Sequence, residues 1–319
     1  FSFVADHFQY VASIGVIVLI VASASVAAAQ VFASTPWLPK TCAGLIVAVL
    51  VVITWRQGKV YEGLEVLWRD TLRKNPGAFL AHNNLGALLN QRGDYAEAEG
   101  HLVEAVRIKP NFVDSVVNLA KAREGLGDFA QAEALYQQAT EINGNFAPAF
   151  NGLGAIYGMT GRVELSEATL RRAIELDPRY AMAHSNLATL FAMTGRMDES
   201  IREYETALQI DPALTEIRGN LARVLMSQQQ LDRAQLVLEE LLETRPTDTG
   251  ALLNLGVIAG NQERYRAAID YFQRVLETDP EHLQANYNLG AMYERIGEPE
   301  RSQFYFQAYE RLRGTPPTQ

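Results

Sequence analysis

The stretch NNLGALLNQRGDYAEAEGHLVEAVRIKPN, residues 83–111, contains the pattern that decides the fold. Its Asn84-Leu85-Gly86 step returns later in the chain as Asn-Leu-Gly or Asn-Leu-Ala, at Asn118, Asn186, Asn220, Asn254 and Asn288. Its closing proline belongs to a series made of Pro76, Pro110, Pro178, Pro212, Pro246 and Pro280. The gaps in this series are 34 residues or twice 34, and the missing member falls at Gly144, another helix breaker. The chain is therefore an array of 34-residue units.

A period of 34 with an Asn-Leu-Gly/Ala core, a small residue twelve places later and a terminal proline is the tetratricopeptide signature. Seven repeats, numbered 1 to 7 below, fill residues 79–314 and begin at Phe79, Val113, Ala147, Ala181, Thr215, Thr249 and Leu283. Each is expected to fold as helix-turn-helix and to pack on its neighbours. We predict an all-α protein whose main part is a right-handed α-solenoid of about seven and a half repeats, with one extended concave face.

Three places in each repeat show how the helices should pack. The eighth holds small residues: Gly86, Ala120, Gly154, Ala188, Ala222, Gly256 and Gly290. The twentieth does too: Ala98, Ala132, Ser166, Ser200, Ala234, Ala268 and Ser302. The twenty-fourth holds Leu102, Tyr136, Leu170, Tyr204, Leu238, Phe272 and Phe306. We expect the two helices of a repeat to cross at the small residues and the large residues to fill the space between neighbouring hairpins. First helices should end at left-handed glycine caps, at Gly93, Gly127, Gly161, Gly195 and Gly297.

A half repeat is predicted over residues 58–78. The segment from Lys59 to Pro76 aligns with the second helix of repeat 1, so that Trp68 matches Leu102. Its absent first helix would lie where an apolar segment stands, which suggests that the solenoid continues directly from that segment. Residues 315–319 are expected to form a frayed tail.

Residues 1–57 have the composition of a membrane segment. Residues 8–32 contain no charged residue and exceed the roughly 20 residues that cross a hydrocarbon core of about 30 Å. A second apolar run lies within residues 38–55 and is flanked by Trp37 and Trp55, residues typical of the membrane interface. We predict two transmembrane helices, with a buried hairpin of a water-soluble domain as the alternative reading.

The composition limits what else the chain can do. With 28 Lys and Arg against 37 Asp and Glu, its formal charge is −9, and no basic run is present, so nucleic acid is not expected as a partner. Five histidines and the single Cys42 lack the spacing of metal ligands. The Gly152–Gly158 stretch resembles a phosphate-binding loop but follows no strand, so helix packing explains it better. We predict no metal, no cofactor and no enzymatic activity for this chain.

The repeated asparagine at the sixth place is the main functional candidate. That place holds Asn84, Asn118, Asn186, Asn220, Asn254 and Asn288, with Gly152 in repeat 3. One reading is structural, in which the amide caps a helix or bridges repeats. The other reading is a ladder along the concave face, because a primary amide can both donate to and accept from a peptide group. The predicted groove residues also include Asn83 and Tyr287 at the fifth place and Lys121 and Arg223 at the ninth, where the cations would favour acidic side chains.

Two resemblances extend these readings. The units containing AHNNLG and AHSNLA resemble the superhelical repeats of O-GlcNAc transferase, which implies that the asparagines grip extended peptide backbone; the transferase domain itself has no counterpart here. The first 80 residues or so, from FSFVADHFQYVASIG to LWRDTLRKNPGAFLAHNNLG, resemble the junction in bacterial transmembrane-and-tetratricopeptide O-mannosyltransferases of the GT-C-like class. That second likeness implies a catalytic part upstream of this chain.

Taken together, these patterns predict a membrane-anchored scaffold that binds proteins or extended peptides, as the C-terminal part of a larger polytopic protein. The alternatives are an acceptor-presenting region of a protein O-glycosyltransferase and an organiser of an envelope or secretion complex. We expect a bacterial inner membrane. The family resemblance puts the solenoid in the periplasm, whereas Arg56 and Lys59 after the second span weakly favour the cytoplasm.

Overall fold

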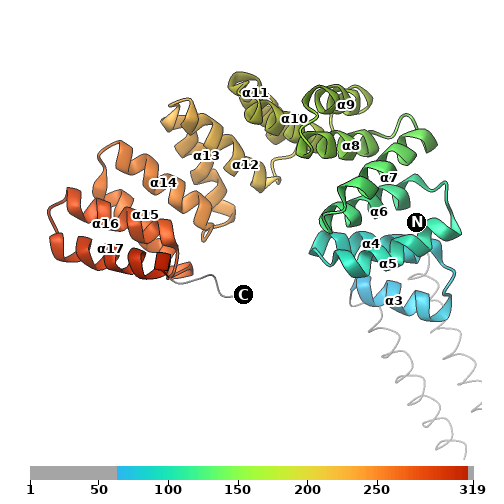
Figure 1. Ribbon diagram of the computed structural model, residues 1–319, viewed down its shortest axis with the longest axis horizontal. Coiled ribbons are helices and arrows are strands. Elements are labelled where there is room, and N and C mark those ends of the chain that lie inside the picture. Colours follow the sequence, from blue (N-terminus) through green and yellow to red (C-terminus); the bar gives the residue numbers. More distant parts are fainter. Residues whose placement is uncertain (1–62, 315–319) are drawn as a thin grey trace, which may run out of the picture. The chain divides into compact units, whose positions relative to one another are not determined.

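The structure, a computed structural model, describes residues 63–314, and every element in that range is an α-helix (Figure 1). The helices are α3 (Leu64–Lys74), α4 (Phe79–Arg92), α5 (Tyr95–Ile108), α6 (Val113–Gly125), α7 (Phe129–Ile142), α8 (Ala147–Met159), α9 (Val163–Leu176), α10 (Ala181–Met193), α11 (Met197–Ile210), α12 (Thr215–Ser227), α13 (Leu231–Thr244), α14 (Thr249–Asn261), α15 (Tyr265–Thr278), α16 (Leu283–Arg295) and α17 (Pro299–Gly314). The all-α solenoid predicted from the sequence is confirmed for these residues.

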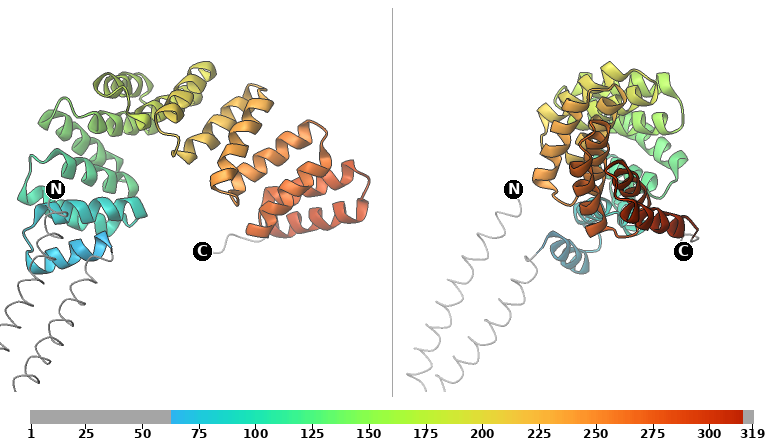
Figure 2. Two further views of the ribbon diagram at one scale, coloured as in Figure 1. Left: turned by 180° about the vertical axis from the view of Figure 1, so that it is seen from behind. Right: turned by 90° about the vertical axis from the view of Figure 1, so that its left-hand side faces the viewer.

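The described chain divides into two compact units at Pro110. The first contains α3 and the hairpin α4–α5, and the second contains the six hairpins from α6–α7 to α16–α17. In the second unit the helices of each hairpin lie side by side, and the hairpins follow one another in chain order (Figure 2). The first helices begin at the residues that open the 34-residue units.

The predicted membrane spans, residues 8–32 and 38–55, and the tail 315–319 lie outside the described residues. Among helices α3–α17, none has both the length and the hydropathy needed to cross a bilayer.

The turns inside the hairpins explain where the first helices end. The fifteenth residue of every repeat has a positive φ, and five of the seven are the predicted glycines, with φ between 76° and 84°. Repeats 5 and 6 place Gln229 and Glu263 there instead, each with a φ of 59°. A side chain in this left-handed region costs free energy that glycine avoids, so these two turns are strained.

The turns between repeats rely on prolines and short polar side chains. Asp177, Asp211 and Asp279 each precede a proline, and each side chain accepts a hydrogen bond from the backbone N–H two residues later, at 3.0–3.2 Å. Asn75, before Pro76, and Asn143, before Gly144, accept the same kind of hydrogen bond. Proline cannot continue a helix and the side chain satisfies a turn donor, so the second helices stop here.

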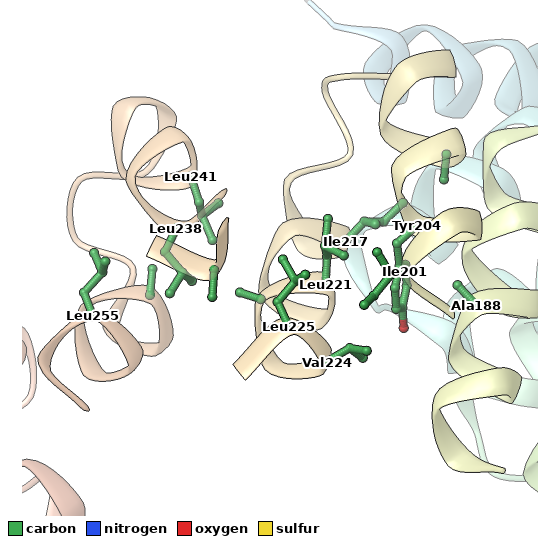
Figure 3. Close-up of a cluster of buried hydrophobic side chains, with 14 of the residues drawn as sticks. Ala188, Ile201, Tyr204, Ile217, Leu221, Val224, Leu225, Leu238, Leu241 and Leu255 are labelled. Atoms are coloured by element: carbon green, nitrogen blue, oxygen red, sulfur yellow. The ribbon is translucent and has the colours of Figure 1, made fainter. Parts of the chain in front are cut away.

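The large residue of the twenty-fourth place was expected between neighbouring hairpins, but in the structure it also lies over the small eighth residue of its own hairpin. A Cβ added at Gly154 would lie 2.7 Å from Leu170 Cγ, and one at Gly290 would lie 2.8 Å from the Phe306 ring. The eighth residue is therefore small because the twenty-fourth of the same repeat covers it. The buried cluster in repeats 4–6 shows the next layer, with Ile217, Leu221 and Leu225 of α12 between Ile201 and Tyr204 on one side and Leu238 and Leu241 on the other (Figure 3).

Candidate functional site: the asparagine face

We call the surface of the first helices that carries the fifth, sixth and ninth places of the repeats the asparagine face. The six predicted asparagines all lie on first helices and are all half-buried. The structure gives them different surroundings. Some are engaged with other side chains, and others border pockets.

In repeats 3 and 4 the asparagine face is closed by side-chain hydrogen bonds. Asn186 Nδ2 donates to Oδ1 of Asn151, which precedes it by 35 residues, at 2.9 Å. The Asn151 amide also shares a hydrogen bond with the Tyr180 hydroxyl, and burial raises the pKa of that tyrosine. Asn151 is only 9% exposed. The bond links neighbouring repeats, which is the structural reading of the asparagine.

Gly152 is the one gap in the asparagine series, and the preceding repeat explains it. A Cβ built on Gly152 would overlap the aromatic ring of Tyr136. The Tyr136 hydroxyl donates to Glu124 Oε2 at 2.9 Å, which holds the ring in that position, and burial raises the pKa of Glu124. The twenty-fourth residue of repeat 2 thus fills the space that an asparagine would need in repeat 3.

In repeats 5 and 6 the asparagine face is open. A pocket of about 230 Å³ lies between α12 and α14, and its lining includes Asn220, Arg223 and Asn254. The lining also includes Gly219, whose Cβ position has no heavy atom within 4 Å. The fifth place of repeats 3 and 4 carries the buried side chains Asn151 and Ser185. Because glycine occupies this place in repeat 5, no side chain from the fifth place fills the pocket.

The polar groups of this smaller pocket are only partly engaged. Arg223 Nη2 donates to Asn220 Oδ1. The Asn254 side chain makes no hydrogen bond to any described residue. Arg245, Asp248 and the exposed Glu216 also line the pocket, and Arg245 Nη1 pairs with Asp248 Oδ2 at 3.5 Å. A free amide and a guanidinium therefore face the same cavity.

A second pocket, of about 470 Å³, lies on the other side of Arg223. It is lined by Thr189, Ala192, Met193, Met197, Tyr204, Asn220, Arg223, Val224 and Ser227. The Tyr204 hydroxyl is within 2.9 Å of Thr189 Oγ1, and burial raises the pKa of Tyr204, so its ring presents a neutral wall. Met193 is 69% exposed at the mouth. This larger pocket is mainly apolar.

The other predicted groove residues are not brought into these pockets. In the first unit, Asn83 is buried and its Nδ2 donates to Asn84 Oδ1 at 3.1 Å. Lys121 is exposed on α6, the helix that also carries Asn118. Tyr287 packs against Phe306 and Tyr309 and borders a separate pocket, and the Nδ2 atom of its neighbour Asn288 is buried without a partner among the described residues.

A second polar series at the fourth place was missed by the sequence reading. His82 Nε2, His184 Nε2, Arg218 Nη1 and Asn286 Nδ2 each lie 2.7–3.4 Å from the carbonyl oxygen of the proline six residues earlier. This series is not visible as a sequence pattern because three residue types, His, Arg and Asn, make the same contact with a proline carbonyl oxygen. No group of His, Cys, Asp and Glu in residues 63–314 could hold a metal ion.

Family models agree with the repeat architecture. The model described as the TPR domain of cytochrome c-type biogenesis protein H matches residues 163–286, and two tetratricopeptide repeat models match residues 89–157 and 53–111. None of these three models is that of a glycosyltransferase, so the predicted likeness to O-mannosyltransferases and to O-GlcNAc transferase receives no support from them. No curated protein matches the sequence.

Solved structures show the same fold at low sequence identity. The APC/C hetero-tetramer Cut9-Hcn1 matches with a TM-score of 0.64 at 16% identity, over 72% of this chain and 45% of that chain. PilF of Pseudomonas aeruginosa matches with 0.56 at 20% identity, over 65% and 95% of the two chains. MamA of Desulfovibrio magneticus RS-1 matches with 0.51 at 19%, over 54% and 97%. This chain thus spans less than half the length of the first of these proteins.

Proposed function

We propose that this chain, whose described residues form tetratricopeptide repeats, is a scaffold that binds an extended peptide segment of a partner protein on the asparagine face of repeats 5 and 6. The observation that carries the proposal is the smaller pocket, in which Asn220, Asn254 and Arg223 line one cavity. Asn254 has a free amide there, and an amide matches the donor and acceptor of a peptide group.

The proposal limits the predicted ladder of six asparagines to Asn220 and Asn254. Asn186 Nδ2 already donates to Asn151, whereas Asn220 uses its Oδ1 to accept from Arg223 and keeps its Nδ2 donor, and Asn254 keeps both groups. A half-buried amide in a cavity contributes a hydrogen bond worth about 0.5–1.5 kcal/mol, so affinity must come from several such groups together.

Anchoring of the scaffold to a membrane through residues 8–32 and 38–55 is a further part of the proposal and rests on the apolar composition of those segments. Fractionation tests it: the full chain should require detergent for extraction, and recovery of the full chain from a detergent-free wash would overturn the anchor. Placement of the repeats in the periplasm is likewise proposed, and a reporter fused after Gln319 should show the non-cytoplasmic signal.

The binding proposal is tested with the full chain and an array of short random peptides. The variant Asn220→Ala with Asn254→Ala should bind the selected peptides about 1–3 kcal/mol more weakly. Its melting temperature should stay unchanged, because neither amide supports packing. Asn111→Ala with Asn145→Ala, which alters exposed turn residues, is the matched control. Failure of the array to yield any binder, or equal binding by the two double variants, would remove the proposed site.

A further inference from the structure

The smaller and larger pockets share two residues, Asn220 and Arg223. These residues therefore stand between a polar cavity and an apolar one, on the same turn of α12. A peptide that lies across Asn220 and Arg223 meets both cavities at once. The two cavities consequently impose different requirements on neighbouring ligand side chains.

Arg223 is a cation with no carboxylate partner among the described residues. Its one hydrogen bond goes to the amide oxygen of Asn220, and its side chain is exposed. Most other arginines of repeats 3 to 5 are paired, as in Arg162 with Glu133, Arg196 with Glu167 and Arg233 with Glu205. In a chain of net charge −9, an arginine left unpaired beside two cavities is suited to a carboxylate from elsewhere.

The acidic groups near Arg223 limit where that carboxylate can lie. Glu216 and Asp248 both line the smaller pocket, whereas the larger pocket has no acidic residue in its lining. In the smaller pocket Asp248 already pairs with Arg245, and the exposed Glu216 repels a further carboxylate, whereas on the side of the larger pocket a carboxylate at Arg223 meets no acidic residue.

The larger pocket suits an apolar side chain. Its apolar lining residues are Ala192, Met193, Met197 and Val224, and the neutral Tyr204 ring lies beside them. Methionine side chains are flexible and polarisable, so they adapt to apolar groups of different shape. Burial of an aliphatic or aromatic side chain against them removes apolar surface from water.

We infer that the site selects peptide segments in which an acidic residue lies beside a large apolar residue, with the carboxylate on Arg223 and the apolar side chain in the larger pocket. This inference rests on the proposed function and specifies its ligand. The backbone of the segment lies against Asn220 and Asn254, and the two side chains give the sequence preference.

The test uses the full chain and a peptide array in which two adjacent central residues are varied within a Gly-Ser frame. Peptides with one acidic and one Leu, Met or Phe residue should be enriched. Arg223→Gln should lower binding of these peptides about tenfold, and it should abolish the difference between Asp and Asn while leaving the difference between Leu and Ser. Ser227→Phe, which fills the larger pocket, should abolish the difference between Leu and Ser while leaving the difference between Asp and Asn.

Two control variants separate these effects from loss of charge or of folding. Arg202→Gln removes the same charge from an exposed place on α11, and Gln209→Phe adds the same ring at another exposed place on that helix, outside both pocket linings; both should bind like the parent. Enrichment of peptides that lack the acidic residue or the large apolar residue would overturn the inference and leave the proposed function standing. An array without any binder would overturn both.

Discussion

Repeats 3 and 4, residues 147–214, and repeats 5 and 6, residues 215–282, have the same helical plan but different asparagine faces. In the first pair, Asn186 bonds to the buried Asn151, and the Tyr136 ring occupies the space beside Gly152. In the second pair, Gly219 leaves a cavity, and Asn220 and Asn254 border it. One repeated residue thus supports packing in one region and is available for binding in the next.

The turns within hairpins and the ion pairs between hairpins are also more favourable in repeats 3 and 4 than in repeats 5 and 6. Repeats 3 and 4 have left-handed glycines at Gly161 and Gly195, whereas repeats 5 and 6 hold Gln229 and Glu263 in that conformation. Arg162 and Arg196 make ion pairs to the preceding repeat, whereas the equivalent Arg264 reaches only the neutral Gln235. The comparison indicates that repeats 3 and 4 are the better-packed support and that repeats 5 and 6 give up some stability where they form the smaller pocket. Four substitutions test it.

The largest effect is expected for Gly152→Asn, which inserts the missing asparagine into the closed region. The new side chain collides with the Tyr136 ring, and overpacking of this kind costs about 1–3 kcal/mol. Urea unfolding followed by circular dichroism measures the loss. The same change at Gly219, where the space is open, should alter stability by less than about 0.5 kcal/mol. Addition of Tyr136→Leu, the residue type of repeats 1, 3 and 5 at that place, should restore the stability of Gly152→Asn.

Asn186→Ala should destabilise the chain by about 1.5 kcal/mol, because it leaves Oδ1 of the buried Asn151 without its Asn186 donor. Asn254→Ala removes the same side chain from the open region, where it makes no hydrogen bond to the described residues, and should leave the melting temperature unchanged. Equal losses of stability in the two variants would mean that the two regions do not differ as described.

Gln229→Gly should stabilise the open region by about 1 kcal/mol, because glycine takes the left-handed conformation without strain. Glu263→Gly should act in the same way. The reverse change in the closed region, Gly195→Gln, should lower the melting temperature by a comparable amount. If Gln229→Gly is neutral or destabilising, the positive φ at that turn carries no strain.

The smallest effect is expected for Gln235→Glu, which gives Arg264 the carboxylate that Arg162 and Arg196 already have. An exposed ion pair of this kind contributes about 0.5 kcal/mol at low salt and less at high salt. Thermal melts at two ionic strengths should show a gain that shrinks with added salt. Gln235→Ala provides the comparison without a carboxylate, and a gain independent of salt would argue against an ion pair.

Much of the fold could be predicted because the responsible residues are local and repeated. Gly86 and Leu102 pack together within one hairpin, and the recurring prolines mark the ends of the units. The 34-residue period was therefore sufficient to place the helices. The series at the fourth place was not predicted, because His, Arg and Asn share no residue type and are united only by a common proline carbonyl. Gln229 and Glu263 were missed for a related reason, since their conformation is imposed by the hairpin rather than by their own preference.

The order of amino acids was enough to establish the number of repeats, the places of the small and large core residues and the recurrence of asparagine at one face of the first helices. It did not distinguish Asn186 from Asn254, which occupy the same place in repeats of the same kind. That distinction depends on residues of the neighbouring repeat, Asn151 in one case and Gly219 in the other, and on how two hairpins meet. A side chain's role is set by the groups that reach it in space, and those groups become neighbours only when the hairpins pack.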